Sequence, residues 1–284
     1  QPDHSMTMRE PSTAGLPLTK ILATLGPATD DQRVLDRLVE HGASIFRLNF
    51  SHGDVEQHAR RLAMVRRAGQ KAGRPLAVLG DLPGPKIRVL AAGDSGIMLH
   101  TGQDVLIRGD VQACAGGELP VIGCNYARIA IEVDPGHRVL INDGAVRMLA
   151  VVTDGEALLC RVTHGGVVST GKGLNLPDSN LSVPATGERD VRMAGWAIEN
   201  GLDFLAMSFV RRAADVRAVR EIMRSSCLLP SAPGVSDGAG QDSGSQIMLI
   251  AKIETPQAVQ NIDEILEAAD ALMVARGDLG VEME

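Results

Sequence analysis

The chain has 284 residues, a formal net charge of −7 and only 2% aromatic residues. The negative charge argues against a nucleic-acid partner, which usually needs a basic face, and no apolar run approaches the roughly 20 residues that span a bilayer. The remaining composition, 44% hydrophobic and 22% charged, is typical of a soluble globular protein whose core is built from Ala, Val, Leu and Ile.

The chain begins with a polar segment, residues 1–18, which has no signal-peptide core and is expected to be a loose tail. The four cysteines of the whole chain show no CxxC pairing, so a disulfide framework or a zinc site is not expected. We interpret them as reduced thiols of a cytoplasmic protein. They are Cys114, Cys124, Cys160 and Cys227.

Residues 19–88 alternate short apolar strands with amphipathic helices, which predicts parallel strands joined by right-handed crossovers. Thr29 or Asp30 can cap the first helix, and Asp54 with Gln57 forms a capping pair for the second. The predicted strands are 21–25, 43–50 and 76–81, and the two helices between them end at Gly42 and Gly73.

Residues 89–183 have a different texture, with many Gly and Asp, short Val/Ile/Leu runs and no convincing helix. Asn142-Asp143-Gly144 and Asp154-Gly155 are typical of hairpin turns. This stretch is predicted to be an inserted all-β domain.

The strand–helix alternation resumes in residues 184–284, with predicted strands near 201–210, 247–253 and 271–275. Helices are expected near 213–223 and after Pro256, which follows a capping Thr255. Residues 225–245, rich in Ser, Gly and Pro, are predicted to be a mobile excursion. About six βα-type strands result, which a doubly wound sheet could use; a closed (β/α)₈ barrel needs eight.

Polar residues gather where these strands end, and in parallel α/β folds the functional groups collect at that edge. Arg47, Asn49 and Ser51 alternate with apolar residues, so they share one face of their strand end. A solvent-facing strand surface is the plainer interpretation, but parallel strands are normally covered on both sides. A functional role is therefore favoured.

Lys252 lies in an apolar strand, and Glu254, two residues on, points the same way. A buried lysine must be paired or have a perturbed pKa. One structural ion pair, or a cation near a substrate beside a metal-holding carboxylate, explains it equally well. Glu254 and Asp278, on successive strand ends, could share a hard divalent ion, and Mg²⁺ favours few carboxylates plus substrate oxygens and water.

Eight short motifs follow one another from about Thr19 to the last residue: ATLGPAT, FRLNFSHG, GPKIR, INDG, GKGLNLP, MSFVR, IAKIET and MVARGDLG. Together, and in this order, they resemble the motifs of pyruvate kinases. The resemblance implies a (β/α)₈ TIM-type barrel, incomplete here with about six βα units, and an inserted all-β lid domain. The expected division is 1–18 tail, 19–88 first barrel part, 89–183 lid and 184–284 second, truncated barrel part.

The resemblance implies transfer of a phosphoryl group from phosphoenolpyruvate to ADP, giving pyruvate and ATP. Lys252 would stabilise the phosphoryl group in flight and the enolate, and Arg47 would bind phosphate. Glu254 and Asp278 would hold Mg²⁺ or Mn²⁺, and Gly277 would contact the substrate carboxylate through its backbone. On the nucleotide side the resemblance places Asn49, His52, Arg88 and Lys172.

The turn after the third strand reads GDLPGPKIR. In K⁺-dependent members of the family the ion sits on an asparagine, a serine, an aspartate and a backbone carbonyl. Those positions match Asn49, Ser51, Asp81 and Leu82. Here Lys86 replaces a glutamate, so the chain resembles the K⁺-independent branch, with a tethered ammonium group supplying the charge.

The chain also departs from the family. The family's seventh and eighth strands and its C-terminal domain are absent, so the chain alone is expected to be inactive and prone to associate through open sheet edges. The alternatives are a catalytically inactive pyruvate-kinase-like binding or subunit protein, and a related phosphoenolpyruvate-binding aldolase or lyase. Full-length family members are homo-oligomers, usually tetramers, without nucleic-acid or membrane partners.

Overall fold

The computed structural model describes residues 19–90, 92, 95–111, 118–227 and 247–283. The predicted tail, most of the 225–245 excursion and Cys114 lie outside these residues. The chain divides into two compact units, described here one at a time: residues up to Asp81 with Leu202–Phe204, and Leu82–Gly201 with Leu205–Glu284. No helix among the described residues is both long and apolar enough to cross a membrane.

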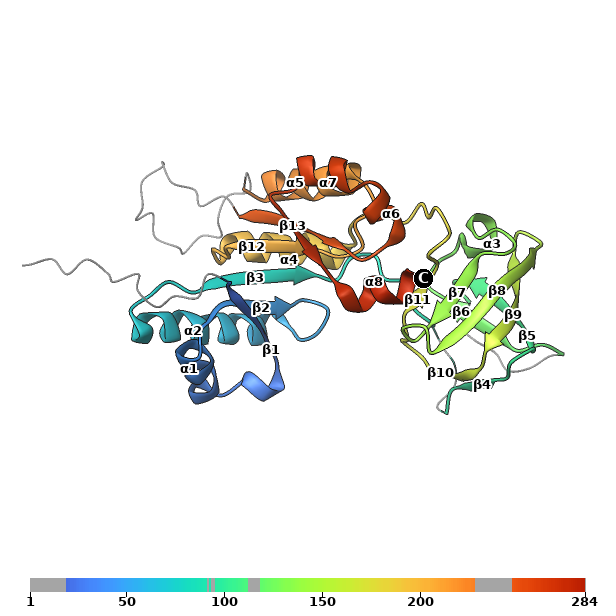
Figure 1. Cartoon of the computed structure of the whole chain (residues 1–284), viewed down its shortest axis with the longest axis horizontal. Helices are drawn as coiled ribbons and strands as arrows, with labels where there is room; N and C mark the ends of the chain where they lie inside the picture. Colours follow the sequence, from blue (N-terminus) through green and yellow to red (C-terminus); the bar gives the residue numbers. More distant parts are fainter. Residues whose placement is uncertain (1–18, 91, 93–94, 112–117, 228–246, 284) are drawn as a thin grey trace, which may run out of the picture. The chain divides into compact units, whose positions relative to one another are not determined.

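The first unit contains three parallel strands, β1 (Ile21–Leu25), β2 (Ala43–Asn49) and β3 (Ala77–Leu82), in that order (Figure 1). Helices α1 (Gln32–Glu40) and α2 (Val55–Ala72) connect them. All three strands were predicted within one residue of their observed ends.

The helix ends of this unit confirm two of the predicted caps and correct one. Asp54 accepts a hydrogen bond from the Gln57 N–H at 2.8 Å, and Gly73 ends α2 at φ 63°, in the left-handed region. The cap of α1 was wrongly predicted: Asp31 accepts the Arg33 N–H at 2.8 Å. Thr29 instead closes a short 3-10 turn (Pro27–Thr29), and Asp30 pairs with Arg61 at 2.6 Å.

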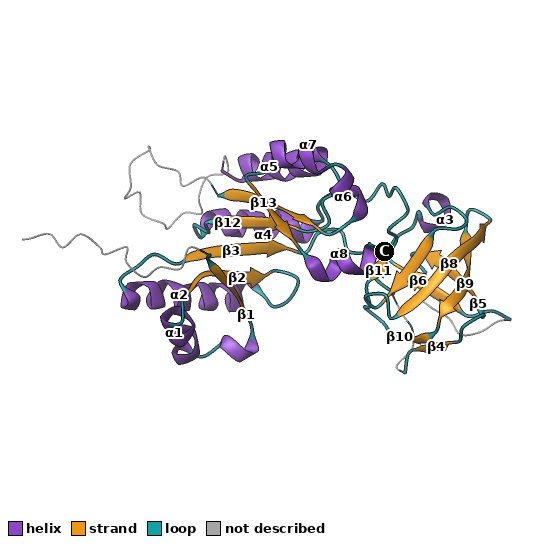
Figure 2. Ribbon diagram, viewed as in Figure 1, coloured by secondary structure: helices purple, strands orange, loops and turns teal. Residues whose placement is uncertain are grey.

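The lid part of the second unit is a six-stranded sheet in the order β11-β7-β8-β9-β5-β6, with a separate β10-β4 pair (Figure 2). Most neighbours are antiparallel, and β5 and β6 are parallel. The strands are β4 (Ile97–Leu99), β5 (Asp104–Gly109), β6 (Val121–Cys124), β7 (Arg138–Ile141), β8 (Val146–Thr153), β9 (Ala157–His164), β10 (Gly166–Val168) and β11 (Leu174–Asn175).

One apolar cluster fills the lid, and Val105, Ile107 and Ile122 in it have no exposed surface. Cys124 and Cys160 are free thiols within this core, and burial raises their pKa values to about 11 and about 12. The predicted all-β character is correct apart from the one-turn helix α3 (Ile129–Glu132). Asn142, Asp143 and Gly144 all have positive φ, which confirms the predicted turn.

The rest of the second unit alternates helices with strands. Its elements are α4 (Glu188–Glu199), β12 (Phe204–Met207), α5 (Ala213–Cys227), β13 (Met248–Ile253), α6 (Pro256–Gln260), α7 (Ile262–Ala268), β14 (Ala271–Val274) and α8 (Arg276–Glu282). Strand β13 pairs with β14 in parallel, and Thr255 caps α6 as predicted, accepting the Ala258 N–H at 3.1 Å. The sequence analysis missed α4, whose buried face includes Met193, Trp196 and Ala197.

Candidate active site

Lys252 lies near the carboxyl end of β13, with its side chain only 10% exposed. Its Nζ donates to Ser208 Oγ at 2.8 Å and pairs with Glu254 Oε1 at 3.0 Å. The ion pair, one of the two interpretations that the sequence left open, is therefore present. Because both partners hold the ammonium group at one point, its charge is fixed in position at the strand end.

Glu254 is almost completely buried, and its two carboxylate oxygens have separate partners. Oε1 contacts Lys252, and Oε2 accepts the Phe209 N–H at 2.7 Å. Phe209 adopts φ 57°, a left-handed conformation that is uncommon for a bulky residue. The backbone after β12 is thus held in a strained shape that aims an N–H at the carboxylate.

Burial raises the pKa of Glu254, and the nearby charge of Asp278 raises it further, while Lys252 and the Phe209 N–H oppose the shift. A second carboxylate close enough to disfavour ionisation is the environment that a divalent cation stabilises. No group of three or more His, Cys, Asp or Glu among the described residues could hold a metal alone. Two carboxylates, with substrate oxygens and water completing the shell, fit Mg²⁺.

Asp278 lies in the first turn of α8, directly after Gly277. A Cβ at Gly277 would meet none of the described atoms within 4 Å, so packing inside the chain does not require glycine there. At the other end of α8, Glu282 Oε1 accepts a hydrogen bond from Asn175 Nδ2 at 2.7 Å. Burial raises the pKa of Glu282 to about 7 against the lowering effect of Asn175.

In the first unit, Arg47 at the end of β2 pairs with Asp81 at the end of β3. Arg47 Nε donates to Asp81 Oδ2 at 2.6 Å, and Nη1 donates to Thr24 Oγ1 at 3.2 Å. Asp81 is 2% exposed, whereas the Arg47 side chain is 25% exposed. The guanidinium group therefore has one anchored edge and some surface left for a ligand.

Asn49 is the β2 residue in register with Asp81 on β3. Its Oδ1 accepts the Ser51 N–H at 3.0 Å, and its backbone carbonyl accepts the His52 N–H at 3.3 Å. The first unit thus brings together five of the predicted site residues at two adjacent strand ends: Arg47, Asn49, Ser51, His52 and Asp81.

In the second unit, Arg88 and Lys172 lie on two neighbouring antiparallel segments. Arg88 bridges to Gly173, the Val89 N–H donates to the Lys172 carbonyl at 2.9 Å, and Arg88 Nη1 donates to the Gly171 carbonyl at 2.9 Å. Backbone pairing therefore brings together two of the four residues that the resemblance placed on the nucleotide side.

Lys86 packs beside the same segments, with its Nζ 5.7 Å from the centre of the Phe209 ring. A Cβ on Gly173 would lie 2.7 Å from the Lys86 side chain, so glycine at that position makes room for it. The Leu82 carbonyl, named in the sequence analysis as a possible ion ligand, accepts a hydrogen bond from Ser208 Oγ at 2.7 Å.

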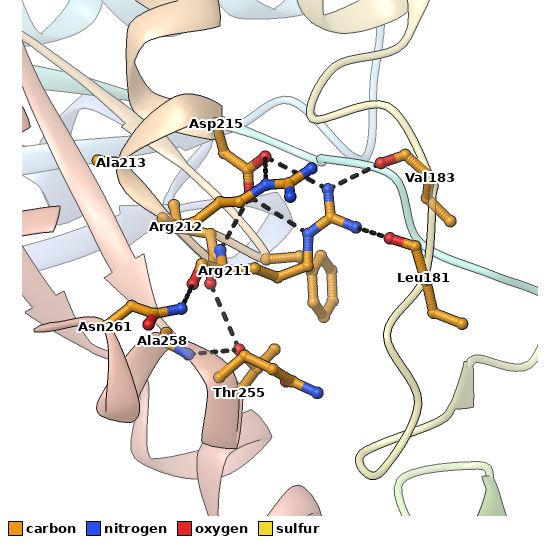
Figure 3. Close-up of polar contacts among 12 residues, drawn as sticks. Leu181, Val183, Arg211, Arg212, Ala213, Asp215, Thr255, Ala258 and Asn261 are labelled. Carbon is orange, nitrogen blue, oxygen red and sulfur yellow. Dashed lines mark hydrogen bonds and ion pairs between the residues drawn. The ribbon is translucent and has the colours of Figure 1, made fainter. Parts of the chain in front are cut away.

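A cavity of about 650 Å³ opens beside these residues in the second unit, with Lys86, Asn175, Phe209, Arg211 and Glu282 among its lining. Arg211 donates to the carbonyls of Leu181 and Val183 at 2.8 and 2.7 Å (Figure 3). Of the site residues predicted from sequence, only Lys86 lines this cavity, together with Phe209, whose N–H binds Glu254.

The sequence analysis missed the roles of Ser208, Phe209 and Arg211. All three lie in the MSFVR stretch that was quoted as a motif, but their chemistry depends on contacts with Leu82, Glu254 and the residues after β11. Only the motif itself could have drawn attention to them.

Comparison with known proteins agrees with this geometry. Residues 16–284 match the family model "Pyruvate kinase, barrel domain". The chain therefore belongs to the pyruvate kinase family, and it carries part of a TIM-type barrel with an inserted all-β lid. The resemblance noted in the sequence is confirmed.

Individual relatives support the same assignment. The chain is 40% identical over 266 residues to a pyruvate kinase of Corynebacterium glutamicum and 39% identical over 266 residues to one of Mycobacterium tuberculosis, covering 93% of this chain and 52% of each relative. A crystal structure of a pyruvate kinase from Cryptosporidium parvum matches with a TM-score of 0.82 at 32% identity, over 93% of this chain and 52% of that one. The chain thus spans about half the length of the relatives it matches.

Proposed function

We propose that this chain provides most of the phosphoryl-transfer site of a pyruvate kinase, which moves phosphate from phosphoenolpyruvate to ADP. The observation that carries the proposal is the buried Lys252–Glu254 pair, with Ser208 and the Phe209 N–H fixing its two halves. Phosphoryl transfer needs alignment and charge neutralisation more than covalent chemistry, and a fixed ammonium group supplies charge without reorganisation.

Each predicted residue takes one part in this proposal. Lys252 faces the transferring phosphoryl group and the enolate oxygen, and Arg47 binds phosphate with the edge that Asp81 leaves open. Gly277 offers its backbone N–H to the substrate carboxylate. Asn49, His52, Arg88 and Lys172 line the nucleotide side.

Glu254 and Asp278 would hold Mg²⁺ or Mn²⁺. When bound, the ion would neutralise the charge of the substrate oxygens. The chain's own part is to present the two carboxylates. At Glu254, Lys252 and the Phe209 N–H favour the ionised form against the burial that raises its pKa.

A coupled assay for ATP formation tests the proposal against the alternative of an inactive binding or subunit protein. The protein should form ATP from phosphoenolpyruvate and ADP in the presence of Mg²⁺, and the isolated 284-residue chain should be much less active. Binding of phosphoenolpyruvate without any ATP formation, in every form of the protein, would favour the inactive protein. The lyase alternative no longer stands, since the chain belongs to the pyruvate kinase family.

We also propose that Lys86 removes the need for K⁺. An ammonium group on a flexible stem can supply the monovalent positive charge that K⁺ supplies in those family members whose ion ligands match Asn49, Ser51, Asp81 and Leu82. Activity in tetramethylammonium buffer at fixed ionic strength should be unchanged by K⁺, and Lys86→Glu should make it K⁺-dependent. Strong activation of the unmodified protein by K⁺ would refute this role.

A cytoplasmic location and a homo-oligomeric assembly follow from the family resemblance and are part of the same proposal. Sedimentation of the native protein would test the assembly.

A further inference from the structure

Two connectors flank the lid along the chain. The outgoing connector, residues 83–88, follows β3, and the returning connector, residues 176–187, runs from β11 to α4. The chain enters and leaves the lid through these two segments.

A single buried carboxylate accepts a hydrogen bond from each connector. Asp190, the third residue of α4, is 2% exposed. Its Oδ2 accepts the Gly187 N–H at 2.7 Å, an ordinary contact at a helix start. Its Oδ1 accepts the Gly84 N–H at 3.1 Å, across 106 positions of sequence, and helix capping does not require that contact.

The outgoing connector is held tightly at the point where Asp190 binds it. Gly84 has φ 67°, and a Cβ there would lie 2.8 Å from the Ser208 carbonyl oxygen. Ser208 Oγ donates to the Leu82 carbonyl at 2.7 Å and accepts from Lys252. The turn that Asp190 holds is therefore in contact with the residue that positions Lys252.

The returning connector has its own anchor. Arg211 donates to the carbonyls of Leu181 and Val183, and Asp215 holds the guanidinium group at 3.2 Å (Figure 3). Asn261 Nδ2 donates to the Arg211 carbonyl at 2.8 Å. This segment is thereby fixed to the beginnings of α5 and α7, a few residues before it reaches Asp190.

The two connectors continue into the paired segments that carry Arg88 and Lys172. Besides the Arg88–Gly173 bridge, the Leu174 N–H donates to the Ile87 carbonyl at 2.9 Å, and the Gly171 N–H donates to the Val89 carbonyl at 2.8 Å. A shift of one connector relative to the other would therefore displace Arg88 and Lys172.

We propose that Asp190 is a positioning residue that holds the two connectors at a fixed separation and so sets the placement of Arg88 and Lys172. It touches no reacting atom; it acts through the backbone of Gly84 and Gly187. Its effect on nucleotide binding rests on the proposed function, whereas the tie between the connectors does not.

Amide hydrogen exchange of Asp190→Asn tests the tie. An amide group offers one acceptor oxygen where the carboxylate offers two, so one connector must lose its acceptor. The Gly84 N–H is the weaker contact and should exchange at least tenfold faster. Glu188→Gln, an exposed change in the same helical turn, should leave exchange within twofold.

The same measurement separates the tie from a plain helix cap. If Asp190 only caps α4, exchange will rise at Gly187 and along the first turn of α4, and Gly84 will be unchanged, which would overturn the proposal. Trp196, the only tryptophan, lies buried on the same helix, and its emission reports whether α4 stays packed. We expect that emission to be unchanged in the Asn variant.

If the Asn variant does not fold, amide exchange in the unmodified chain still tests whether Asp190 ties the two connectors. The Gly84 N–H should exchange at least a hundredfold more slowly than its intrinsic rate, and exchange near the intrinsic rate would contradict the tie. In a protein that forms ATP, the Asn variant should raise KM for ADP by a larger factor than it lowers kcat. Absence of ATP formation in the unmodified protein would reject the proposed function and leave the exchange result to judge the tie.

Discussion

The lid sheet and the strand ends of the second unit bury very different residues. The lid core is apolar throughout, with Val105, Ile107 and Ile122 fully enclosed. The strand ends bury charged and hydroxyl groups instead, among them Lys252 and Glu254. Apolar burial stabilises a fold without directing chemistry, whereas buried charges are destabilising unless they are paired. The contrast assigns the lid core to scaffolding and the strand ends to function.

The largest effect is expected at Lys252, on the functional side of this contrast. Lys252→Met keeps the length of the side chain and removes the charge aimed at the transferring group. Phosphoryl transfer should fall by about 10³-fold or more, with a much smaller change in substrate binding. The measurement is kcat and KM in the form of the protein that forms ATP.

Lys71→Met is the matched control, because Lys71 lies on α2 with its side chain 67% exposed and pairs with Asp36. It should leave kcat unchanged. Near-normal turnover of the Lys252 variant would show that the buried ammonium group is structural only.

The next effect concerns the scaffold. Ile107→Ala removes a fully buried side chain from the lid core and should lower the free energy of unfolding by about 3 kcal/mol. Val151→Ala, on β8 of the same sheet with 42% of the residue exposed, should change it by less than about 0.5 kcal/mol. Urea unfolding followed by circular dichroism measures both. Equal effects would mean that the lid core does not stabilise the fold as described.

Much of this contrast could be predicted from sequence. The strands at 21–25, 43–50 and 76–81 could be predicted because the spacing of apolar residues and the Gly and Pro residues that end each element are local properties of the sequence. The two-residue spacing of Lys252 and Glu254 placed them on one side of the strand and gave an ion pair as one of two interpretations. The helix α4 was missed because it begins in the polar stretch that follows the lid. The end of the β pattern there was used only to set the end of the lid domain.

Other features could not be predicted, because they depend on contacts between distant segments. Asp190 reaches Gly84 across 106 positions, and Ser208 meets Leu82 across 126. The Asp31 cap was missed for a different reason: three adjacent residues could each cap α1, and tertiary pairing of Asp30 with Arg61 decided among them.

A smaller, pH-dependent effect is expected where the lid meets the returning connector. Glu132 is half-buried, and this desolvation raises its pKa, but hydrogen bonds from Ser182, Tyr126 and Arg128 outweigh it and lower the pKa to about 2. Since the folded pKa lies below the ordinary 4.5, the stabilisation is present above about pH 4.5 and is lost as the pH falls towards 2.

Glu132→Gln should therefore destabilise the chain by about 1–2 kcal/mol at pH 7 and flatten the loss of stability between pH 4.5 and pH 2. Glu156→Gln, at a carboxylate whose side chain is 82% exposed, serves as the control. Thermal unfolding across that pH range measures the difference. An unchanged acid profile in the Glu132 variant would place the acid sensitivity elsewhere.

The most direct test of the proposed phosphoryl-transfer site is Mn²⁺ binding to the chain itself, measured by an electron paramagnetic resonance titration. If Glu254 and Asp278 form a divalent-cation site, Glu254→Gln and Asp278→Asn should each weaken Mn²⁺ binding at least tenfold, or about 1.4 kcal/mol. Asp263→Asn, at an exposed carboxylate in the first turn of α7, should leave the affinity unchanged. Equal Mn²⁺ affinity in the unmodified chain and in the Glu254 variant would contradict the assignment of these strand ends as the phosphoryl-transfer site.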